Sequence, residues 1–254
     1  VVRAYLSSMS ASDFFAVMTL GMSTVAGSVL VLYASVLSSV TDAAVSQIVA
    51  ASLLNIVGAL YISRLFEPET VSDKSYEETT SSLNYDGTID ALAKGTRDGI
   101  MLAVNVGAMV LVLVSLVALA NGLLSIVNLF ETPLSLERIF GWIFSPIAWL
   151  IGIPWDEAAI GGSLLGTKLV LNELLAFIQL AELAPELSEH STRVLTFALC
   201  GFANFGSLGI LLGGLYILVP ERREETIKMA PKSIVSGTMV TLMSASLVSV
   251  ITSI

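Results

Sequence analysis

Five stretches of the chain are long and apolar enough to be candidates for membrane-spanning helices. Each exceeds the roughly 18 residues without charged side chains that mark such a helix. Their apolar residues do not alternate with a polar face, as they do in the amphipathic helices of soluble proteins. The pattern therefore predicts an all-α membrane protein. The stretches are Phe14–Thr41, Ala43–Ser63, Gly99–Phe130, Val194–Pro220 and Ser233–Ile254.

Two of the predicted spans are interrupted by small and polar residues. The first, Phe14–Leu37, contains glycine, serine and threonine over Gly21–Ser28, which allow a helix to unwind or to approach a neighbour closely. The second, Arg193–Leu218, is interrupted from Gly201 to Ser207. Interrupted segments in corresponding places of two halves are typical of a transporter binding site. The uninterrupted spans that follow them are Ala43–Leu65 and Pro231–Ile254.

The region Leu134–Leu180 has a different pattern, because prolines, tryptophans and glycines punctuate it. The segment Pro154–Glu157 predicts a turn, and the tryptophans are typical of the membrane interface. Glycines predict helix breaks at Gly161–Ser163 and at Gly166–Thr167. Because the arms beside these breaks are too short to cross a membrane separately, we expect a re-entrant hairpin with its tip in the membrane. Short interfacial helices are expected to flank it.

The remaining segments connect these elements. Thr70–Arg97 is predicted to be mostly an acidic, solvated loop, with an amphipathic stretch over Gly87–Lys94. Asp98–Val127 is predicted to be a scaffold helix that faces lipid and its neighbours, and Pro220–Lys228 a charged connection. The chain then divides into the first broken helix with its following span (1–70), the acidic loop and amphipathic segment (71–97), the scaffold span (98–130), and the interfacial helix, hairpin, second broken helix and last span (131–254).

Composition supports a membrane protein and argues against other classes. Only 13% of the 254 residues are charged and 55% are hydrophobic, whereas soluble domains carry about 25% charged residues. The net charge is −9, without a basic patch, so no nucleic-acid partner is expected. A single cysteine excludes a disulfide framework and a metal site built from cysteines. The sequence contains no nucleophile–base pair or phosphate-binding loop, so we predict neither an enzyme nor a cofactor.

Two polar features lie inside apolar sequence and are the candidates for function. Lys168 and Glu173 are ionisable residues in the predicted hairpin, and such groups are costly at membrane depth. Lys168 is expected either to pair with Glu173 or to cap backbone carbonyls at the hairpin tip. Asn204 and Ser207 are three residues apart, so we expect both on one helix face. Hydrogen bonding between helices is the alternative role for these two residues.

Three segments resemble signatures of the concentrative nucleoside transporter family. Thr167–Phe177 resembles its Gly-Thr-Lys-x-x-x-Asn-Glu-Phe-x-Ala-Tyr signature, except that Leu174 and Phe177 replace the usual Phe and Tyr. Ala198–Ile210 is similar to a second signature, and Phe15–Val29 to the first broken helix of the family. The three motifs occur in the same order as in the family, so the resemblance extends over nearly the whole chain.

The resemblance implies a nucleoside symporter that is coupled to sodium or protons and works by an elevator mechanism. It implies a homotrimer of multi-pass subunits in the cell membrane, with the bacterial inner membrane as the expected location. In the family, a first hairpin that reads the nucleobase precedes the point that corresponds to Val1. We therefore expect this chain to correspond to the C-terminal part of such a transporter, and the base preference stays open.

The resemblance also implies roles for individual substrate-binding residues. Glu173 corresponds to the hairpin carboxylate that accepts hydrogen bonds from ribose hydroxyls, and Asn204 and Ser207 correspond to further ribose-binding positions. Phe202 corresponds to an aromatic wall residue, and Val29 to a residue that packs against the base. The chemistry is consistent, because a carboxylate accepts hydrogen bonds from two vicinal hydroxyls.

A cation site is implied at the first break. Thr24 corresponds to a side-chain oxygen ligand of sodium and Val25 to a backbone carbonyl ligand, although a threonine hydroxyl often bonds back to its own helix. Lys168 and Asn172 are expected to support the hairpin tip.

Two other functions compete with nucleoside transport. A non-transporting membrane gate or scaffold module predicts no nucleoside binding and tolerance of alanine at Asn204 and Ser207. A different small-molecule carrier, such as one for dicarboxylates, needs a cationic or serine-rich site. The carboxylate of Glu173 disfavours an anionic substrate.

Overall fold

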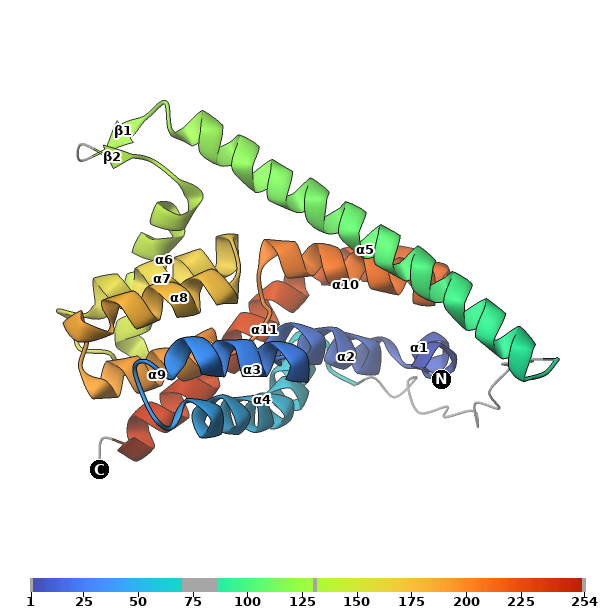
Figure 1. The fold of residues 1–254 in the computed structure, drawn as a ribbon, viewed down its shortest axis with the longest axis horizontal. Coiled ribbons are helices and arrows are strands. Elements are labelled where there is room, and N and C mark those ends of the chain that lie inside the picture. Colours follow the sequence, from blue (N-terminus) through green and yellow to red (C-terminus); the bar gives the residue numbers. More distant parts are fainter. Residues whose placement is uncertain (1, 70–85, 130–131, 253–254) are drawn as a thin grey trace.

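The computed structural model describes residues 2–69, 86–129 and 132–252, most of which are helical. Residues 70–85 of the predicted acidic loop lie outside this part of the chain. The elements are α1 (Val2–Ser8), α2 (Ala11–Ser23), α3 (Gly27–Leu37), α4 (Ala44–Phe66), α5 (Thr88–Leu124), β1 (Asn128–Leu129), β2 (Thr132–Pro133), α6 (Leu136–Leu150), α7 (Ala158–Val170), α8 (Glu173–Leu183), η2 (Ala184–Glu186), α9 (Glu189–Leu199), α10 (Phe205–Leu218), η3 (Pro220–Arg222) and α11 (Arg223–Thr252) (Figure 1).

Three helices in the described ranges are long and apolar enough to cross a membrane: α4, α5 and the continuous segment Pro220–Thr252 that contains α11. The single antiparallel pair β1–β2 involves only two residues on each side and leaves the fold essentially all-α. The helical class predicted from the sequence is confirmed.

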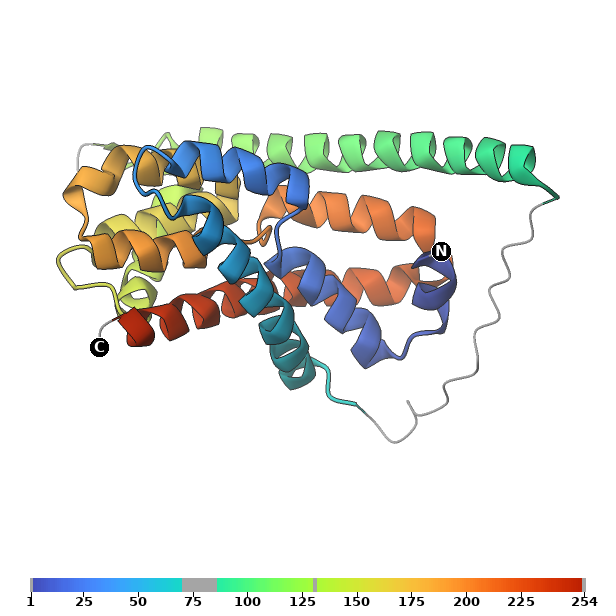
Figure 2. The ribbon, with the colours of Figure 1, turned by 60° about the horizontal axis from the view of Figure 1, so that its bottom comes forward.

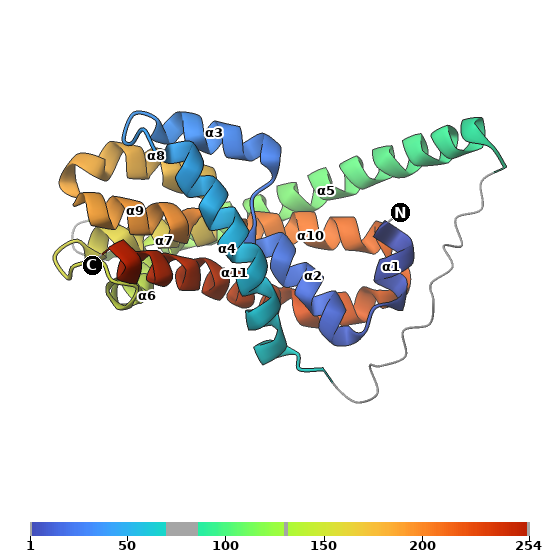
Figure 3. The same ribbon diagram turned by 90° about the horizontal axis from the view of Figure 1, so that it is seen from below.

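Both predicted broken helices are present. The first consists of α2 and α3, with Thr24–Ala26 between them; the second consists of α9 and α10, with Cys200–Asn204 between them. The uninterrupted helices α4 and α11 contact each other, and both contact α2 and α9 (Figure 3). The two breaks are thereby brought to the middle of the helical assembly.

The hairpin is formed by α7 and α8, but its break is not where the glycines predicted it. Helix α7 continues through Gly162 and Gly166, and the chain turns at Leu171 and Asn172 instead. A Cβ atom at Gly162 would lie 2.5 Å from the Gly141 carbonyl oxygen of α6, and one at Gly166 would lie 2.7 Å from the Glu137 carbonyl oxygen. The glycines of α7 therefore allow close packing against α6 and do not interrupt the helix.

Two predicted boundaries are wrong because helices continue through polar sequence. Helix α5 begins at Thr88, so the amphipathic stretch is its first part and not a separate segment. Helix α11 begins at Arg223 and runs through Pro231. Its start is fixed by Arg222, whose guanidinium donates to the carbonyl oxygens of Leu6 and Met9 and forms an ion pair with Glu225.

Helix α5 differs from the rest in its surroundings. It runs as a long rod along one side of the molecule (Figure 2), and none of its residues is buried. Its main contact is with α10, where Gly209 and Gly213 lie against the α5 backbone. A Cβ atom would be 2.9 Å from the Met109 carbonyl oxygen at the first glycine and 3.1 Å from the Asn105 carbonyl oxygen at the second. Apolar exposure on this scale marks a surface that lipid or another protein covers.

Candidate functional site

The carboxylate of Glu173 lies at the centre of the candidate site. Glu173 is the first residue of α8, and its side chain is buried, with 5% exposed. The Tyr33 hydroxyl donates to Oε1 at 2.5 Å, and the Asn204 amide donates to Oε2 at 2.7 Å. The positive end of the α8 dipole also favours an anion at this position. Because each carboxylate oxygen can accept a second hydrogen bond, the group retains capacity for a ligand.

Asn204 holds this carboxylate from the second broken helix. It is the N-cap of α10, and its Oδ1 accepts a hydrogen bond from the Ser207 backbone N–H at 2.6 Å. Asn204 and Ser207 are adjacent as expected, but they are not two residues of one helix face, because Asn204 has extended backbone angles and precedes the helix. The cap leaves the Asn204 amide free to reach across to α8, so the N-termini of α8 and α10 are joined through side chains.

Asn172 has a matching place at the hairpin tip. It is the N-cap of α8, and its Oδ1 accepts from the Leu175 backbone N–H at 2.9 Å. Two asparagine caps therefore precede the two helices that meet at Glu173.

Tyr33 was not among the residues identified from the sequence. It lies on α3, is completely buried, and its ring centre is 4.9 Å from that of Phe177. The available signal was its spacing, because Tyr33 follows Val29 by one helical turn and lies on the same face of α3. Val29 itself is partly buried and packs against the main apolar core.

Lys168 is buried but does not form an ion pair with Glu173. Its ammonium group donates to the Ala198 carbonyl oxygen at 2.8 Å and to the Thr241 hydroxyl at 3.0 Å. Of the two roles expected, the structure shows the contact with a carbonyl, at the end of α9. Lys168 thus connects the hairpin to the second broken helix and to α11.

Thr24 and Val25, the expected cation ligands, lie in the first break. The Thr24 hydroxyl donates to the Leu20 carbonyl oxygen at 2.8 Å, so it bonds back to α2. A hydroxyl oxygen that donates still has lone pairs with which it can coordinate a cation. No group of three or more His, Cys, Asp or Glu side chains that could hold a metal ion occurs among the described residues.

The two breaks touch each other next to a buried amide. Asn55 of α4 donates from Nδ2 to the Ser23 carbonyl oxygen at 2.8 Å and to the Cys200 carbonyl oxygen at 2.7 Å. Its side chain is completely buried. An isolated asparagine in the apolar span Ala43–Leu65 was the signal for this contact, since polar residues in such spans often bond across helices.

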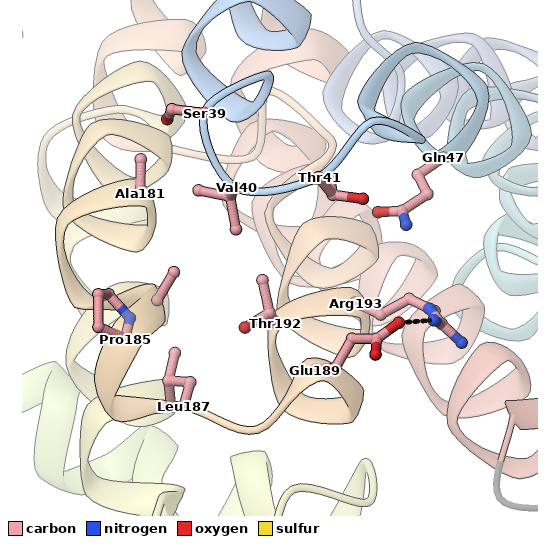
Figure 4. A pocket seen from close by; sticks show the side chains of 11 residues that line it. Ser39, Val40, Thr41, Gln47, Ala181, Pro185, Leu187, Glu189, Thr192 and Arg193 are labelled. Carbon is pink, nitrogen blue, oxygen red and sulfur yellow. Dashed lines mark hydrogen bonds and ion pairs between the residues drawn. The ribbon is translucent and has the colours of Figure 1, made fainter.

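A cavity of about 450 Å³ lies between α2 and α10, and Phe202 and Ser207 line it together with Met22 and Ala26 of the first broken helix. Small-molecule sites commonly have volumes of about 300–1,000 Å³. A second pocket, of about 510 Å³, lies between the turn after α3 and the α8–α9 connection (Figure 4). None of the candidate site residues lines this second pocket.

Residues 47–249 match the family model described as "Na+ dependent nucleoside transporter C-terminus". The chain is 37% identical to the nucleoside permease NupC of Helicobacter pylori, in an alignment that covers 97% of this chain and 59% of the permease. The chain spans about 60% of the length of the bacterial relatives from Bacillus subtilis, Haemophilus influenzae and Helicobacter pylori and 40% of the length of the sodium/nucleoside cotransporter 1 of Mus musculus.

Solved structures of CNTnw share the fold. A double variant in an outward-facing state has a TM-score of 0.87 at 39% identity, covering 99% of this chain and 60% of that one. An inward-facing, substrate-bound state has a TM-score of 0.73 at 40% identity, covering 98% and 60%. The conformation of this chain is therefore more similar to the outward-facing structure. Taken with the family-model match, these similarities establish that the chain belongs to the sodium-dependent nucleoside transporter family and corresponds to its C-terminal region.

Proposed function

We propose that the protein containing this chain is a cation-coupled nucleoside symporter and that Glu173 binds the sugar. The observation that carries the proposal is a buried carboxylate held between two helix N-termini by Tyr33 and Asn204. A buried carboxylate is costly to retain in a membrane protein unless it has a function. The vicinal hydroxyls of a ribose are donors that fit the remaining acceptor capacity of both oxygens.

Three further residues are proposed to complete the nucleoside site, although Glu173 is not among the residues that line the cavity between α2 and α10. Ser207 offers a hydroxyl and Phe202 an apolar ring at the cavity between α2 and α10. Val29, on α3, is proposed to pack against the base. The name of the relative from Helicobacter pylori, a nucleoside permease, agrees with this substrate class.

We propose sodium as the coupling ion, bound at the first break. Sodium prefers hard oxygen ligands, and unwound helix segments in transporters supply them as backbone carbonyls. Thr24 and Val25 lie in such a segment, between α2 and α3. The description of the matching family as Na+ dependent supports sodium over protons.

The proposed transport cycle is an elevator movement in a homotrimer. Helix α5 is the scaffold, because none of its residues is buried, and the body that contains the site moves against it. The glycines of α10 present a flat surface to α5 at Gly209 and Gly213. Joint binding of cation and nucleoside would lower the cost of moving the polar site through the membrane, since it compensates the Glu173 charge and occupies its acceptors.

The test is Glu173→Gln in the complete gene product. The neutral amide weakens hydrogen bonds to sugar hydroxyls, and its NH₂ group opposes the Asn204 amide if Oε1 still accepts from Tyr33. Hydrogen bonds to charged groups contribute about 1.5–3 kcal/mol each, so uridine affinity is expected to fall by roughly 30-fold. Uridine binding and cation-driven uptake into vesicles measure this.

The matched control is Glu189→Gln, which changes an exposed carboxylate on α9 that is ion-paired with Arg193. This variant is expected to bind and take up uridine like the wild type. Unchanged uridine uptake by Glu173→Gln would contradict the proposed function.

A further inference from the structure

The side chain of Asn55 joins the two helix breaks. Ser23 is the last residue of α2 and Cys200 is the C-cap of α9. Carbonyl groups at helix C-termini have no partner within the helix and must find one elsewhere. The Asn55 amide supplies one hydrogen bond to each of these two carbonyl groups. A single side chain of α4 therefore terminates the first halves of both broken helices.

The backbones of the two breaks are also in direct contact. A Cβ atom at Gly201 would lie 2.7 Å from the Ser23 carbonyl oxygen, so only glycine fits here without a shift of the neighbouring chain. On its other side, the same atom would lie 2.6 Å from a methyl group of Thr241. The two breaks are therefore joined by close backbone packing as well as by the Asn55 amide.

The orientation of the Asn55 amide is fixed by its partners. Reversing it would direct Oδ1 at two carbonyl oxygens, which cannot donate. In the observed orientation, Oδ1 has no hydrogen-bond partner within the described residues. A buried acceptor without a partner is unfavourable, so the amide is poorly explained as a stabilising element alone. Its two donated bonds are what distinguish it from an apolar residue of the same size.

We propose that Asn55 is the positioning residue that couples cation binding at the first break to nucleoside binding at the second. This inference rests on the proposed function. Ser23 immediately precedes Thr24, and Cys200 lies two residues before Phe202 and four before Asn204. A cation that orders the backbone at Thr24 fixes the Ser23 carbonyl, and Asn55 transfers that order to Cys200. If the cation raises the nucleoside affinity by a given factor, thermodynamic linkage requires the nucleoside to raise the cation affinity by that same factor.

The experiment measures the uridine dissociation constant of the complete gene product without sodium and at saturating sodium. Sodium is expected to raise the uridine affinity of the wild type by on the order of tenfold or more, which is a typical coupling between sites. In Asn55→Leu, which keeps the volume but lacks the donors, this factor should fall to about twofold or less. A purely structural role predicts lower affinity in both conditions with an unchanged ratio.

The matched control is Asn105→Leu. Asn105 also lies in an apolar helix, but its amide donates to the Met101 carbonyl oxygen of its own helix α5. The sodium-dependent ratio is expected to remain that of the wild type.

The outcomes separate this inference from the proposed function. A wild type that does not bind uridine overturns both. A wild type whose uridine affinity depends on sodium, together with an Asn55→Leu variant that shows the same ratio, overturns only the role of Asn55.

If Asn55→Leu does not fold, hydrogen exchange of the wild type provides the measurement. Sodium without nucleoside is expected to slow amide exchange at residues 200–205 as well as at residues 23–27. Protection limited to the first break overturns the inference.

Discussion

Each of the two broken helices consists of two helical segments joined by a short non-helical break. They differ in whether a side chain caps the start of the second segment. Helix α10 is preceded by its N-cap Asn204, whose side chain caps the helix and also donates to Glu173. Helix α3 is preceded by Ala26 at the N-cap position, which supplies no side-chain hydrogen bond. The second break thus presents side chains, whereas the first presents mainly backbone and one hydroxyl. Sugar hydroxyls suit directed side-chain acceptors, and a sodium ion suits carbonyl oxygens. This difference supports the proposal that the first break binds the cation and the second binds the nucleoside.

The largest effect is expected from removing the side chain at the second break. Asn204→Ala loses the α10 cap, which lowers folding stability. For binding, it loses the hydrogen bond that orients the Glu173 carboxylate and the proposed ribose contact of Asn204, which together contribute about 3 kcal/mol. Uridine affinity should fall by roughly 100-fold, while sodium affinity in the absence of nucleoside stays within about threefold of the wild type. Isothermal titration of each ligand alone checks both values. An equal loss of affinity for uridine and for sodium would show that the nucleoside and the cation do not bind at separate breaks.

An intermediate effect is expected at Tyr33, which contacts the carboxylate from the other broken helix. Tyr33→Phe keeps the packing against Phe177 and removes only the donor to Oε1. A hydrogen bond to a charged group contributes about 1.5 kcal/mol or more, so uridine affinity should fall by roughly tenfold.

Competition with uridine lacking one sugar hydroxyl makes the Tyr33 test specific. If Tyr33 orients the carboxylate toward the sugar, Tyr33→Phe should lower the preference for uridine over its 3′-deoxy analogue. A uniform loss for both nucleosides would indicate a structural contribution only.

The smallest effect is expected at the first break. Thr24→Val has nearly the same shape and removes a hydroxyl that already donates to the Leu20 carbonyl oxygen. The loss of one neutral ligand is expected to cost about 1 kcal/mol, so sodium affinity should fall by roughly fivefold. Uridine affinity at saturating sodium should be unchanged, which is the reverse of the Asn204→Ala pattern. Measuring uridine binding at increasing sodium concentrations gives both affinities. An unaltered sodium dependence would argue against Thr24 as a sodium ligand.

Glycine was the least reliable guide to structure in this sequence. At Gly21–Ser28 and Gly201–Ser207 it correctly predicted that helices are interrupted, but at Gly162 and Gly166 the helix continues. The same residue permits both unwinding and close packing, and only the neighbouring helix decides which occurs. In α7 the partner is α6, whose backbone lies within contact distance of both glycines.

The polar residues show a similar division. Their placement in apolar sequence marked Glu173 and Asn204 as candidates, because the cost of burying them is a property of the residue type. Their partners could not be read from the sequence. Tyr33 is 140 positions from Glu173, and Lys168 contacts Thr241 rather than the nearby carboxylate.

The sequence by itself determined the helical membrane class, the two interruptions and the residues with polar chemistry inside apolar spans. These features follow from local composition. The length of an uncharged apolar stretch can be read directly from the sequence, and the cost of burying a charged side chain is a property of the residue type. The tertiary structure alone decided that the two breaks touch, that Asn55 donates to both, and that Tyr33 and Asn204 share one carboxylate. Such contacts depend on how helices distant in sequence cross, and local pattern does not encode those crossings.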